Sequence, residues 1–278
     1  MRILVIGATG MLGQDVLRTL TALGHQCLGV GSRNVDIRDA AAVHRAVTAF
    51  MPQAIVHCAA YTAVDRAESD VAECMAVNAT GAMNLARAAR EVDAKLLYIS
   101  TDYVFDGSGS EPREITDAPR PLNIYGLSKL QGEEAVRSLV QKHFILRTSW
   151  VFGHGGRNFV DTIRRLGREK PCLSVVDDQV GSPTYTIDLA QLIAQMLPTD
   201  RYGTYHATNE GFCSFAEFAR AILRCEGCIS QVFSITSDKY PSAARRPLNG
   251  CLSKRSLDEN GFHRLPHWED ALKRYLNQ

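Results

Sequence analysis

The feature that most constrains the fold is a glycine pattern that directly follows a short apolar run. Residues 2–6 are mostly apolar, and Gly7, Gly10 and Gly13 come next at intervals of three. Such a run is typical of a strand buried on both faces of a parallel sheet, and the amphipathic pattern of residues 14–23 is typical of a helix. Glycines between a strand and a helix let the backbone approach a diphosphate at the helix N-terminus. The pattern therefore predicts a dinucleotide site, with a tight strand–helix turn alone as the alternative.

Predicted strands and helices then alternate along the chain. We expect strands at residues 26–30, 54–58, 95–99 and 144–147, and helices at residues 40–50, 71–92 and 187–197. This alternation predicts an α/β fold with a doubly wound, Rossmann-like parallel sheet. We assign residues 1–153, completed by about 173–199, to a dinucleotide-binding domain, and residues 154–172 and 200–278 to a smaller C-terminal substrate-binding lobe.

The end of the second predicted strand bears on the choice of cofactor. NAD-selective sites place an acidic residue there to hold the ribose hydroxyls. Here the strand runs into Ser32 and Arg33, and the first acid is Asp36. A hydroxyl and an arginine suit a 2′-phosphate better than a carboxylate does. The sequence therefore favours NADPH over NADH, with Arg33 as an ordinary loop residue as the alternative.

Two segments carry groups suited to reducing a carbonyl. The fourth predicted strand brings Ser100 and Thr101 to the carboxyl edge of the sheet, where ligands bind in open α/β sheets. Tyr125 and Lys129 are four residues apart and share one face of a helix. A nearby cation lowers the pKa of a phenol, which would make Tyr125 a proton donor near pH 7. The Thr101 hydroxyl would hydrogen-bond the carbonyl oxygen as it gains charge.

Candidate substrate contacts lie later in the chain. Trp150 follows the fifth predicted strand, where it would line a pocket or belong to the core. Arg245 and Arg246 lie on a turn before Pro247. Cations and aromatic rings beside a cofactor cleft suit an anionic, nucleotide-linked substrate. Surface solubility is the alternative role for the two arginines.

Charge and cysteine usage exclude other classes of function. The formal net charge is +1 and the chain has no basic block, which argues against nucleic acid or an anionic membrane as a partner. No apolar run approaches the roughly 18 residues of a membrane span. Eight scattered cysteines are typical of reduced thiols in a cytoplasmic protein. Cys225 and Cys228 are the only close pair, and we interpret them as a helix end with Gly227 as its stop.

Longer motifs identify a resemblance. Residues 59–68, 100–105, 123–129, 147–150 and 178–184 read AAYTAVDRAE, STDYVF, NIYGLSK, RTSW and DQVGSPT. Together with the glycine pattern, they resemble the dTDP-4-dehydrorhamnose reductases of the extended short-chain dehydrogenase/reductase superfamily. The resemblance implies NAD(P)H-dependent reduction of the C4 keto group of dTDP-4-dehydro-L-rhamnose, which gives dTDP-L-rhamnose for cell-surface polysaccharide biosynthesis.

The resemblance also implies roles for individual residues. Tyr125 would protonate the C4 oxygen, Thr101 would hydrogen-bond it, and Lys129 would hold the nicotinamide ribose and lower the pKa of Tyr125. The cofactor-binding set is Gly7, Gly10, Met11, Leu12, Gly13, Ser32, Arg33, Asp36, Ile37, Ala59, Ala60, Tyr61, Asn78, Tyr125 and Lys129. The substrate-binding set is Thr101, Asp102, Tyr125, Trp150 and Arg246.

Some members of that family dimerise through a magnesium ion held by acidic residues, so the resemblance extends to a homodimer. Asp15 and Asp188 stand in comparable places here, but Ile187 replaces a second acid, and we therefore predict no metal. Two alternatives to the reductase stay open. One is a non-catalytic cofactor-binding protein resembling the regulatory subunit of methionine adenosyltransferase. The other is a nucleotide-sugar epimerase or dehydratase, although dehydratases typically place Asp-Glu where Asp102 and Tyr103 follow Thr101.

Overall fold

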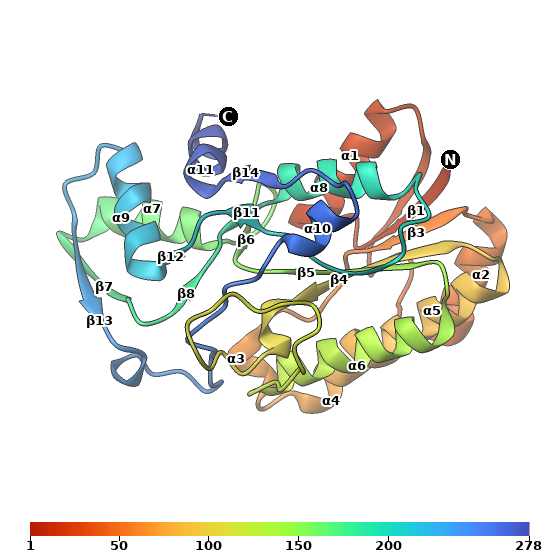
Figure 1. Cartoon of the computed structure of the whole chain (residues 1–278), viewed down its shortest axis with the longest axis horizontal. Coiled ribbons are helices and arrows are strands. Elements are labelled where there is room, and N and C mark those ends of the chain that lie inside the picture. The colour runs from red at the N-terminus through yellow and green to blue at the C-terminus, as the bar shows by residue number, and fades with distance from the viewer. Residues whose placement is uncertain (278) are drawn as a thin grey trace.

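A parallel six-stranded sheet forms the centre of the protein in a computed structural model that describes residues 1–277 (Figure 1). Its strand order is β10-β5-β4-β3-β1-β2, and every neighbouring pair is parallel. The strands are β1 (Arg2–Ile6), β2 (Gln26–Val30), β3 (Ala54–His57), β4 (Lys95–Thr101), β5 (His143–Thr148) and β10 (Gly203–His206). The predicted doubly wound α/β fold is confirmed.

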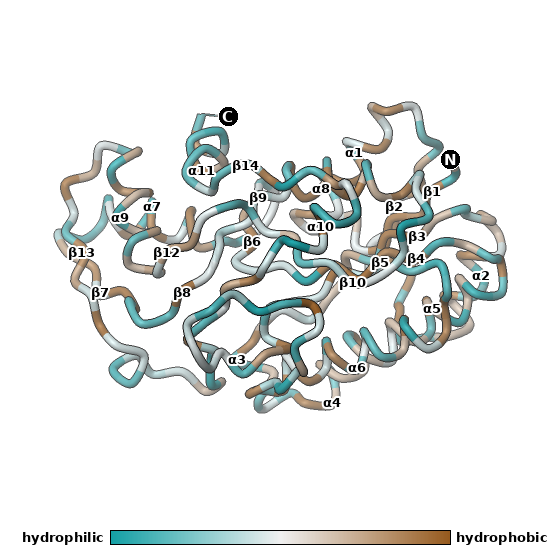
Figure 2. The backbone as a smooth tube through the Cα atoms, in the orientation of Figure 1, coloured by the Kyte–Doolittle hydropathy of each residue, from teal (hydrophilic) through white to brown (hydrophobic). Residues whose placement is uncertain are grey.

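Helices cover both faces of this sheet (Figure 1). On one face lie α1 (Met11–Ala22) and α8 (Thr186–Met196), and on the other lie α2 (Ala40–Phe50), α5 (Gly81–Glu91) and α6 (Ile124–Leu139). In β1, Ile3 and Val5 pack into the first core and Leu4 and Ile6 into the second. Successive side chains of a strand point to opposite faces, so burial on both sides requires an uninterrupted apolar run. Figure 2 shows this hydrophobic colouring along the central strands.

A topological switch point lies between β1 and β3. The chain passes from β1 to β2 on one side and returns to β3 on the other. Ligands bind at such a point because the turns after the two strands diverge there. The turn after β1 is bonded to β2, since the amides of Gly7 and Ala8 both donate to the Val30 carbonyl. The glycine turn after β1 therefore lies at this switch point, where a ligand can bind.

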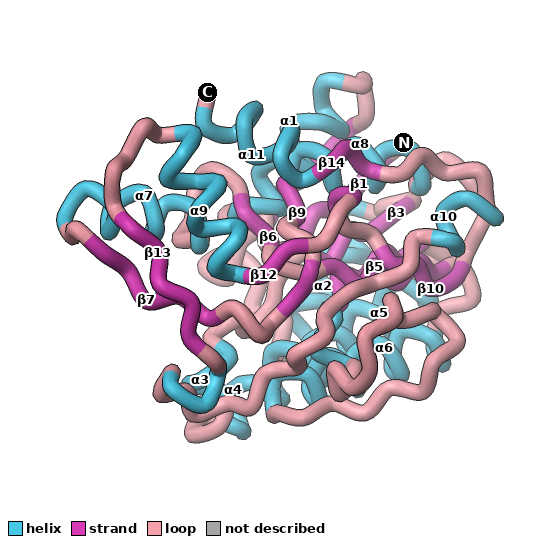
Figure 3. Tube along the Cα trace, turned by 60° about the vertical axis from the view of Figure 1, so that its left-hand side comes forward, coloured by secondary structure: helices cyan, strands magenta, loops and turns pink. Residues whose placement is uncertain are grey.

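The second lobe is built from pairs of short strands (Figure 3). The pairs are β6 (Val151–Phe152) with β9 (Thr184–Tyr185), β7 (Cys172–Val176) with β13 (Gln231–Ile235), β8 (Val180–Gly181) with β12 (Cys213–Ser214), and β11 (Asn209–Glu210) with β14 (Leu265–His267). Helices α7 (Phe159–Glu169), α9 (Phe215–Cys225) and α11 (Trp268–Leu276) pack around them. Their shared core is rich in aromatic rings, including Phe152, Tyr185, Phe218 and Tyr275.

Short elements complete the chain. They are α3 (Val64–Ala67), α4 (Val71–Met75), the π-helical η1 (Ala76–Thr80), the 3₁₀ turns η2 (Asp102–Val104) and η3 (Ser237–Lys239), and α10 (Arg255–Glu259). The predicted helix at residues 71–92 is therefore a continuous run of α4, η1 and α5. Within residues 1–277, no helix is both long and apolar enough to span a bilayer.

Two segments lie outside the part of the molecule to which we assigned them. Strand β10 falls within residues 200–278, yet it pairs with β5 in the central sheet. All of strand β7 except Cys172 falls within residues 173–199, yet the strand pairs with β13 in the second lobe. Both strands are short, and a short strand does not specify its partner by its own pattern. Helix α8 decides the first case, because it packs on α1 and returns the chain to the sheet edge.

Candidate active site

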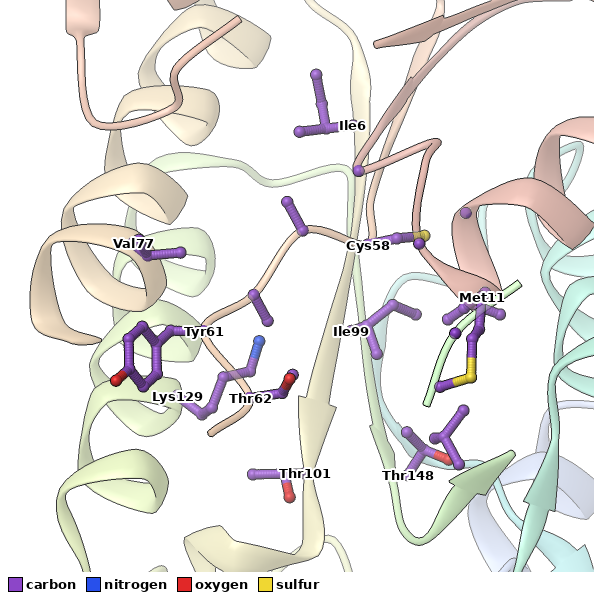
Figure 4. Close-up of a pocket in the computed structure, with 18 of the residues that line it drawn as sticks. Ile6, Met11, Cys58, Tyr61, Thr62, Val77, Ile99, Thr101, Lys129 and Thr148 are labelled. Carbon is purple, nitrogen blue, oxygen red and sulfur yellow. The ribbon is translucent and has the colours of Figure 1, made fainter. Parts of the chain in front are cut away.

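A cleft of about 1050 Å³ runs along the carboxyl ends of the central strands and is closed on one side by the second lobe. Sixteen of the predicted site residues line it: Gly7, Gly10, Met11, Leu12, Gly13, Ser32, Asp36, Ile37, Ala59, Ala60, Tyr61, Thr101, Asp102, Tyr125, Lys129 and Trp150. Figure 4 shows Met11 at the start of α1 on one side of the cleft, with Lys129 reaching from α6 on the other. Arg33, Asn78 and Arg246 are not among the lining residues.

The three glycines of the first turn differ in what requires them. Gly7 has a φ of +81°, and a Cβ on it would lie 2.6 Å from the Ala59 amide nitrogen. A Cβ on Gly13 would lie 2.1 Å from the Gly7 carbonyl oxygen, so these two glycines allow turn, strand and helix to pack. A Cβ on Gly10 would meet only that oxygen, at 3.5 Å. Packing does not require Gly10, and its bare backbone faces the cleft.

The first turn of α1 suits an anion. Gly10 is its N-cap, no side chain caps it, and no acidic residue lies in its first turn. The first amides of a helix lack partners within the helix and carry partial positive charge. The small side chains of Ala59 and Ala60 lie across the cleft at the end of β3. These residues fit the diphosphate and ribose of a dinucleotide.

Near the turn after β2, an arginine that was not among the predicted site residues pairs with two acids. Arg38 pairs with Asp36 (Nη2–Oδ2, 2.7 Å) and with Glu73 (Nη1–Oε1, 2.7 Å), and all three line the cleft. Ser32 also lines it, whereas Arg33 is exposed and outside it. The Asp36 carboxylate therefore already has a protein cation as its partner, which it shares with Glu73.

Asn78 acts on the cleft indirectly. Its buried side chain accepts a hydrogen bond from the Tyr61 amide (2.8 Å) and donates to the Tyr61 carbonyl (3.1 Å). The same amide group donates to the Ser128 hydroxyl at 2.9 Å. Asn78 lies in the π-helical segment η1, and such segments occur frequently at functional sites. It thus joins the cleft-lining turn after β3 to the helix that carries Tyr125 and Lys129.

Tyr125 and Lys129 lie on one face of α6, whose first turn is capped by the Asn123 side chain through the Gly126 amide (2.8 Å). Burial raises the pKa of the Tyr125 phenol, and a hydrogen bond with Thr101 offsets this only in part. Burial also lowers the pKa of Lys129 to about 7, although Glu133 opposes the change. The Lys129 amine stands 4.1 Å from the centre of the Tyr98 ring.

The predicted lowering of the Tyr125 pKa is therefore wrong for this structure. A buried lysine loses part of its own charge, so it cannot strongly favour a buried phenolate beside it. Tyr125 stays a neutral phenol that carries its proton. A neutral phenol is the form required of a group that donates a proton to a reduced carbonyl oxygen.

A buried ionic network, which no pattern in the sequence indicated, underlies these residues. Arg147 donates to Glu133 through Nε (2.8 Å) and Nη2 (2.7 Å), and the Ser100 hydroxyl donates to the same carboxylate at 2.6 Å. All three residues are buried. Glu133 follows Lys129 by one helical turn, Ser100 precedes Thr101, and Arg147 lies in β5. The Glu133 network (Glu133, Arg147 and Ser100) therefore fixes α6 against β4 and β5.

Asp102 is the acidic residue nearest the reactive hydroxyl. Its Oδ1 accepts a hydrogen bond from Thr101 at 3.0 Å, and its buried Oδ2 has no partner among the described residues. A Cβ on Gly250 would lie 2.7 Å from that Oδ2, so a loop of the second lobe approaches closely. Burial raises the pKa of Asp102 to about 7. Asp102 thus lines the cleft, while its unpaired Oδ2 is buried against the loop that carries Gly250.

Two aromatic rings form the lobe side of the cleft. Trp150 stacks on Phe215, with ring centres 3.6 Å apart and planes at 16°. Both line the cleft, and Phe215 was not predicted. Trp150 has a φ of +46°, a strained conformation for a bulky residue. Trp150 lines the cleft, as one of its two predicted roles requires, and it also packs against the core of the second lobe.

Arg246 lies beside the cleft and is paired. Its Nη2 meets Asp65 Oδ2 at 2.6 Å, and it also interacts with the Tyr103 phenol. Tyr103 lines the cleft and packs edge-on against Tyr125, with ring centres 5.7 Å apart. The neighbouring Arg245 carbonyl accepts a hydrogen bond from Asn123 at 2.8 Å. The turn that carries both arginines is thus attached to the start of α6.

The acids considered for magnesium have protein partners. Asp15 accepts from Thr186 (2.6 Å) and Arg18 (3.1 Å), and Asp188 pairs with Arg274 at 2.7 Å. Residues 1–277 contain no group of three or more His, Cys, Asp or Glu side chains arranged to hold a metal. The interpretation of the close cysteine pair is confirmed: α9 ends at Cys225, and Gly227 follows with a φ of +65°.

The family described as the RmlD substrate binding domain matches residues 1–278. The chain belongs to the RmlD family. A relative, the spore coat polysaccharide biosynthesis protein SpsK of Bacillus subtilis, is 39% identical over 277 residues, which are 100% of this chain and 97% of the relative.

Two solved structures extend the match to RmlD-type reductases. The dTDP-4-dehydrorhamnose reductase of Clostridium acetobutylicum has a TM-score of 0.98 at 38% identity and covers 100% of this chain and 99% of its own. That of Bacillus anthracis, in complex with NADP, has a TM-score of 0.97 at 41% identity and covers 99% and 98%. The resemblance inferred from the sequence motifs is confirmed.

Proposed function

We propose that the protein reduces the C4 keto group of dTDP-4-dehydro-L-rhamnose to give dTDP-L-rhamnose, with NADPH as the reductant. The observation that carries this proposal is the meeting of Thr101, Tyr125 and Lys129 in one cleft with the bare turn at Gly10. Relatives that bear the reductase name match the chain over its whole length. The second lobe, with Trp150 and Phe215, would receive the nucleotide-sugar.

The chain's own residues account for the proton and the orientation of the ketone. When bound, the reduced nicotinamide supplies the hydride that forms the new C–H bond at C4. Tyr125 donates its phenolic proton to the C4 oxygen as the C=O double bond becomes a single bond. Thr101 hydrogen-bonds the same oxygen and stabilises its developing charge. Lys129 would hold the nicotinamide ribose, and a partly charged amine there supports the return of a proton to Tyr125.

The preference for NADPH rests on the turn after β2. Asp36 is paired with Arg38, which engages the carboxylate that would otherwise bind ribose hydroxyls and weakens its repulsion of a 2′-phosphate. Ser32 lines the same end of the cleft. Arg33→Ala is expected to weaken NADPH binding more than NADH binding, because only NADPH carries the phosphate. Equal losses in a titration with both cofactors would assign Arg33 to the ordinary surface.

The test is a reaction of the protein with dTDP-4-dehydrorhamnose and NADPH, followed by NADPH absorbance and by mass and stereochemical analysis of the product. One NADPH consumed per dTDP-L-rhamnose formed supports the proposal. An epimerase would convert nucleotide-sugars without net NADPH consumption, and a regulatory protein would bind NADPH without consuming it. Either outcome would replace the reductase with that alternative.

A further inference from the structure

The cations that line the cleft differ in burial and in whether a protein group already pairs with them. Among the described residues, three cations line the cleft: Arg38, Lys129 and Arg157. Lys129 is buried, and Arg38 is paired with both Asp36 and Glu73. Arg157 is exposed, and it makes no hydrogen bond, ion pair or ring contact with any residue of 1–277. Within residues 1–277, Arg157 is thus the one cation lining the cleft that has no protein partner.

The loop that carries Arg157 is closed at both ends. Residues 153–158 join β6 to α7, and the Asn158 side chain donates to the Gly153 carbonyl at 3.0 Å. The same side chain accepts from the Asp161 amide at 2.9 Å and so caps α7. It also donates to the Tyr275 hydroxyl at 3.1 Å. The base of the loop is therefore fixed by one buried asparagine.

Two glycines place this loop on the first turn of α1. A Cβ on Gly155 would lie 2.8 Å from Gln14 Oε1, and one on Gly156 would lie 2.5 Å from Met11 Cγ. Gly155 also has a φ of +81°, which disfavours other residues. The backbone can lie this close to α1 only because it carries no side chains there. Arg157 follows directly, at the edge of the uncapped helix N-terminus.

We propose that Arg157 binds the diphosphate of a nucleotide held in this cleft, opposite the amides of the glycine turn. The inference rests on the proposed function, because that function requires two diphosphate esters, one in the dinucleotide and one in the nucleotide-sugar. The position of the loop on Met11 and Gln14 favours the dinucleotide. A guanidinium and helix-terminal amides then neutralise the same anion from two sides.

The test is calorimetric titration of the intact protein with NADPH alone and, separately, with dTDP alone. The variants are Arg157→Ala, the conservative Arg157→Lys, and the matched control Arg45→Ala, whose exposed arginine lies on α2 outside the cleft. A charge-assisted bond to phosphate predicts that Arg157→Ala raises the Kd for NADPH about tenfold at low salt. The difference should shrink as salt rises, and Arg157→Lys should restore part of it.

Each outcome decides a separate point. A loss of NADPH binding confined to Arg157→Ala supports the proposal for the dinucleotide. A loss of dTDP binding alone keeps Arg157 as a diphosphate residue and moves its ligand to the nucleotide-sugar. Unchanged affinity for both ligands, or equal losses in Arg45→Ala, overturns it. If the wild-type protein fails to bind NADPH, the proposed reductase fails instead, whatever Arg157 does.

Discussion

The two sides of the cleft are positioned by different kinds of contact. On the sheet side, Gly10 and Thr101 stand where a strand ends, within a few residues of the element that holds them. On the lobe side, Trp150 is held by Phe215, and Arg246 by Asp65, which lies 181 residues earlier in the chain. The proposed chemistry depends on the locally determined side. Recognition of the nucleotide-sugar depends on the side that is assembled from distant pairs.

The polar contacts of the two sides also differ in burial. The Glu133–Arg147 pair leaves 0% and 2% of its side chains exposed, whereas the Arg246–Asp65 pair leaves 21% and 47% exposed. Removing one partner of a buried pair leaves an uncompensated charge, while an exposed pair is screened by water. Substitutions on the sheet side should therefore lower both the free energy of unfolding and the turnover. Substitutions on the lobe side should mainly weaken the affinity for the substrate.

The largest effect should follow loss of the Tyr125 hydroxyl. Tyr125→Phe is expected to lower turnover by about 10²–10⁴-fold, the range for a general acid, with the Kd for NADPH and the melting temperature unchanged. Steady-state kinetics, cofactor titration and thermal unfolding measure the three quantities. Tyr103→Phe is the matched control, because that ring packs against Tyr125 and lines the cleft without an assigned proton. If Tyr125→Phe kept the turnover of the wild type, Tyr125 would not be the proton donor.

Loss of the buried carboxylate should affect folding most. Glu133→Ala strands Arg147 and is expected to reduce the free energy of unfolding by about 3–5 kcal/mol. The adjacent Glu134 is exposed, so Glu134→Ala should change it by no more than about 0.5 kcal/mol. Denaturant unfolding of both variants gives the comparison. Similar small losses would show that the Glu133 network does not support the sheet side.

Asp102 lies between the two sides of the cleft, and its buried carboxyl should make stability depend on pH. Its pKa is raised from 3.8 to about 7, so the folded protein binds a proton that the unfolded chain releases between these values. Folding stability from this group is therefore present at low pH and is lost as pH rises towards 7. Asp102→Asn should gain about 1–3 kcal/mol relative to wild type at pH 8 compared with pH 5. The exposed Asp238→Asn should show no such gain, and a pH-independent difference in Asp102→Asn would contradict the burial of its charge.

The same division explains what the sequence could predict. The glycine turn and the hydroxyl at Thr101 follow from local patterns, because a strand end and a short turn fix where they point. The Glu133 network could not be found, since a glutamate on a helix and an arginine on a strand are ordinary until the fold brings them together. Phe215 and Arg157 were missed for the same reason. Strand β10 was misplaced because its partner depends on α8 and not on its own residues.

The sharpest test of the lobe side concerns Arg246, where we expect a small effect on stability and an effect of about tenfold on KM. The pair with Asp65 is partly exposed, so Arg246→Ala should change the free energy of unfolding by no more than about 1 kcal/mol. Because Arg246→Ala removes the predicted contact with the substrate phosphate, it should nevertheless raise KM for the nucleotide-sugar about tenfold at saturating NADPH. The Kd for NADPH should be unchanged.

Asp65→Ala separates two explanations for such a rise in KM. If Arg246 contacts the phosphate directly, freeing its guanidinium from Asp65 should leave KM unchanged or lower it. If the pair acts only by holding the turn of residues 242–247 near Tyr103, both variants should raise KM equally, because each breaks the same contact. An unchanged KM in Arg246→Ala would contradict both explanations. The lobe side would then depend on Trp150 and Phe215, whose stacking brings together residues 65 positions apart.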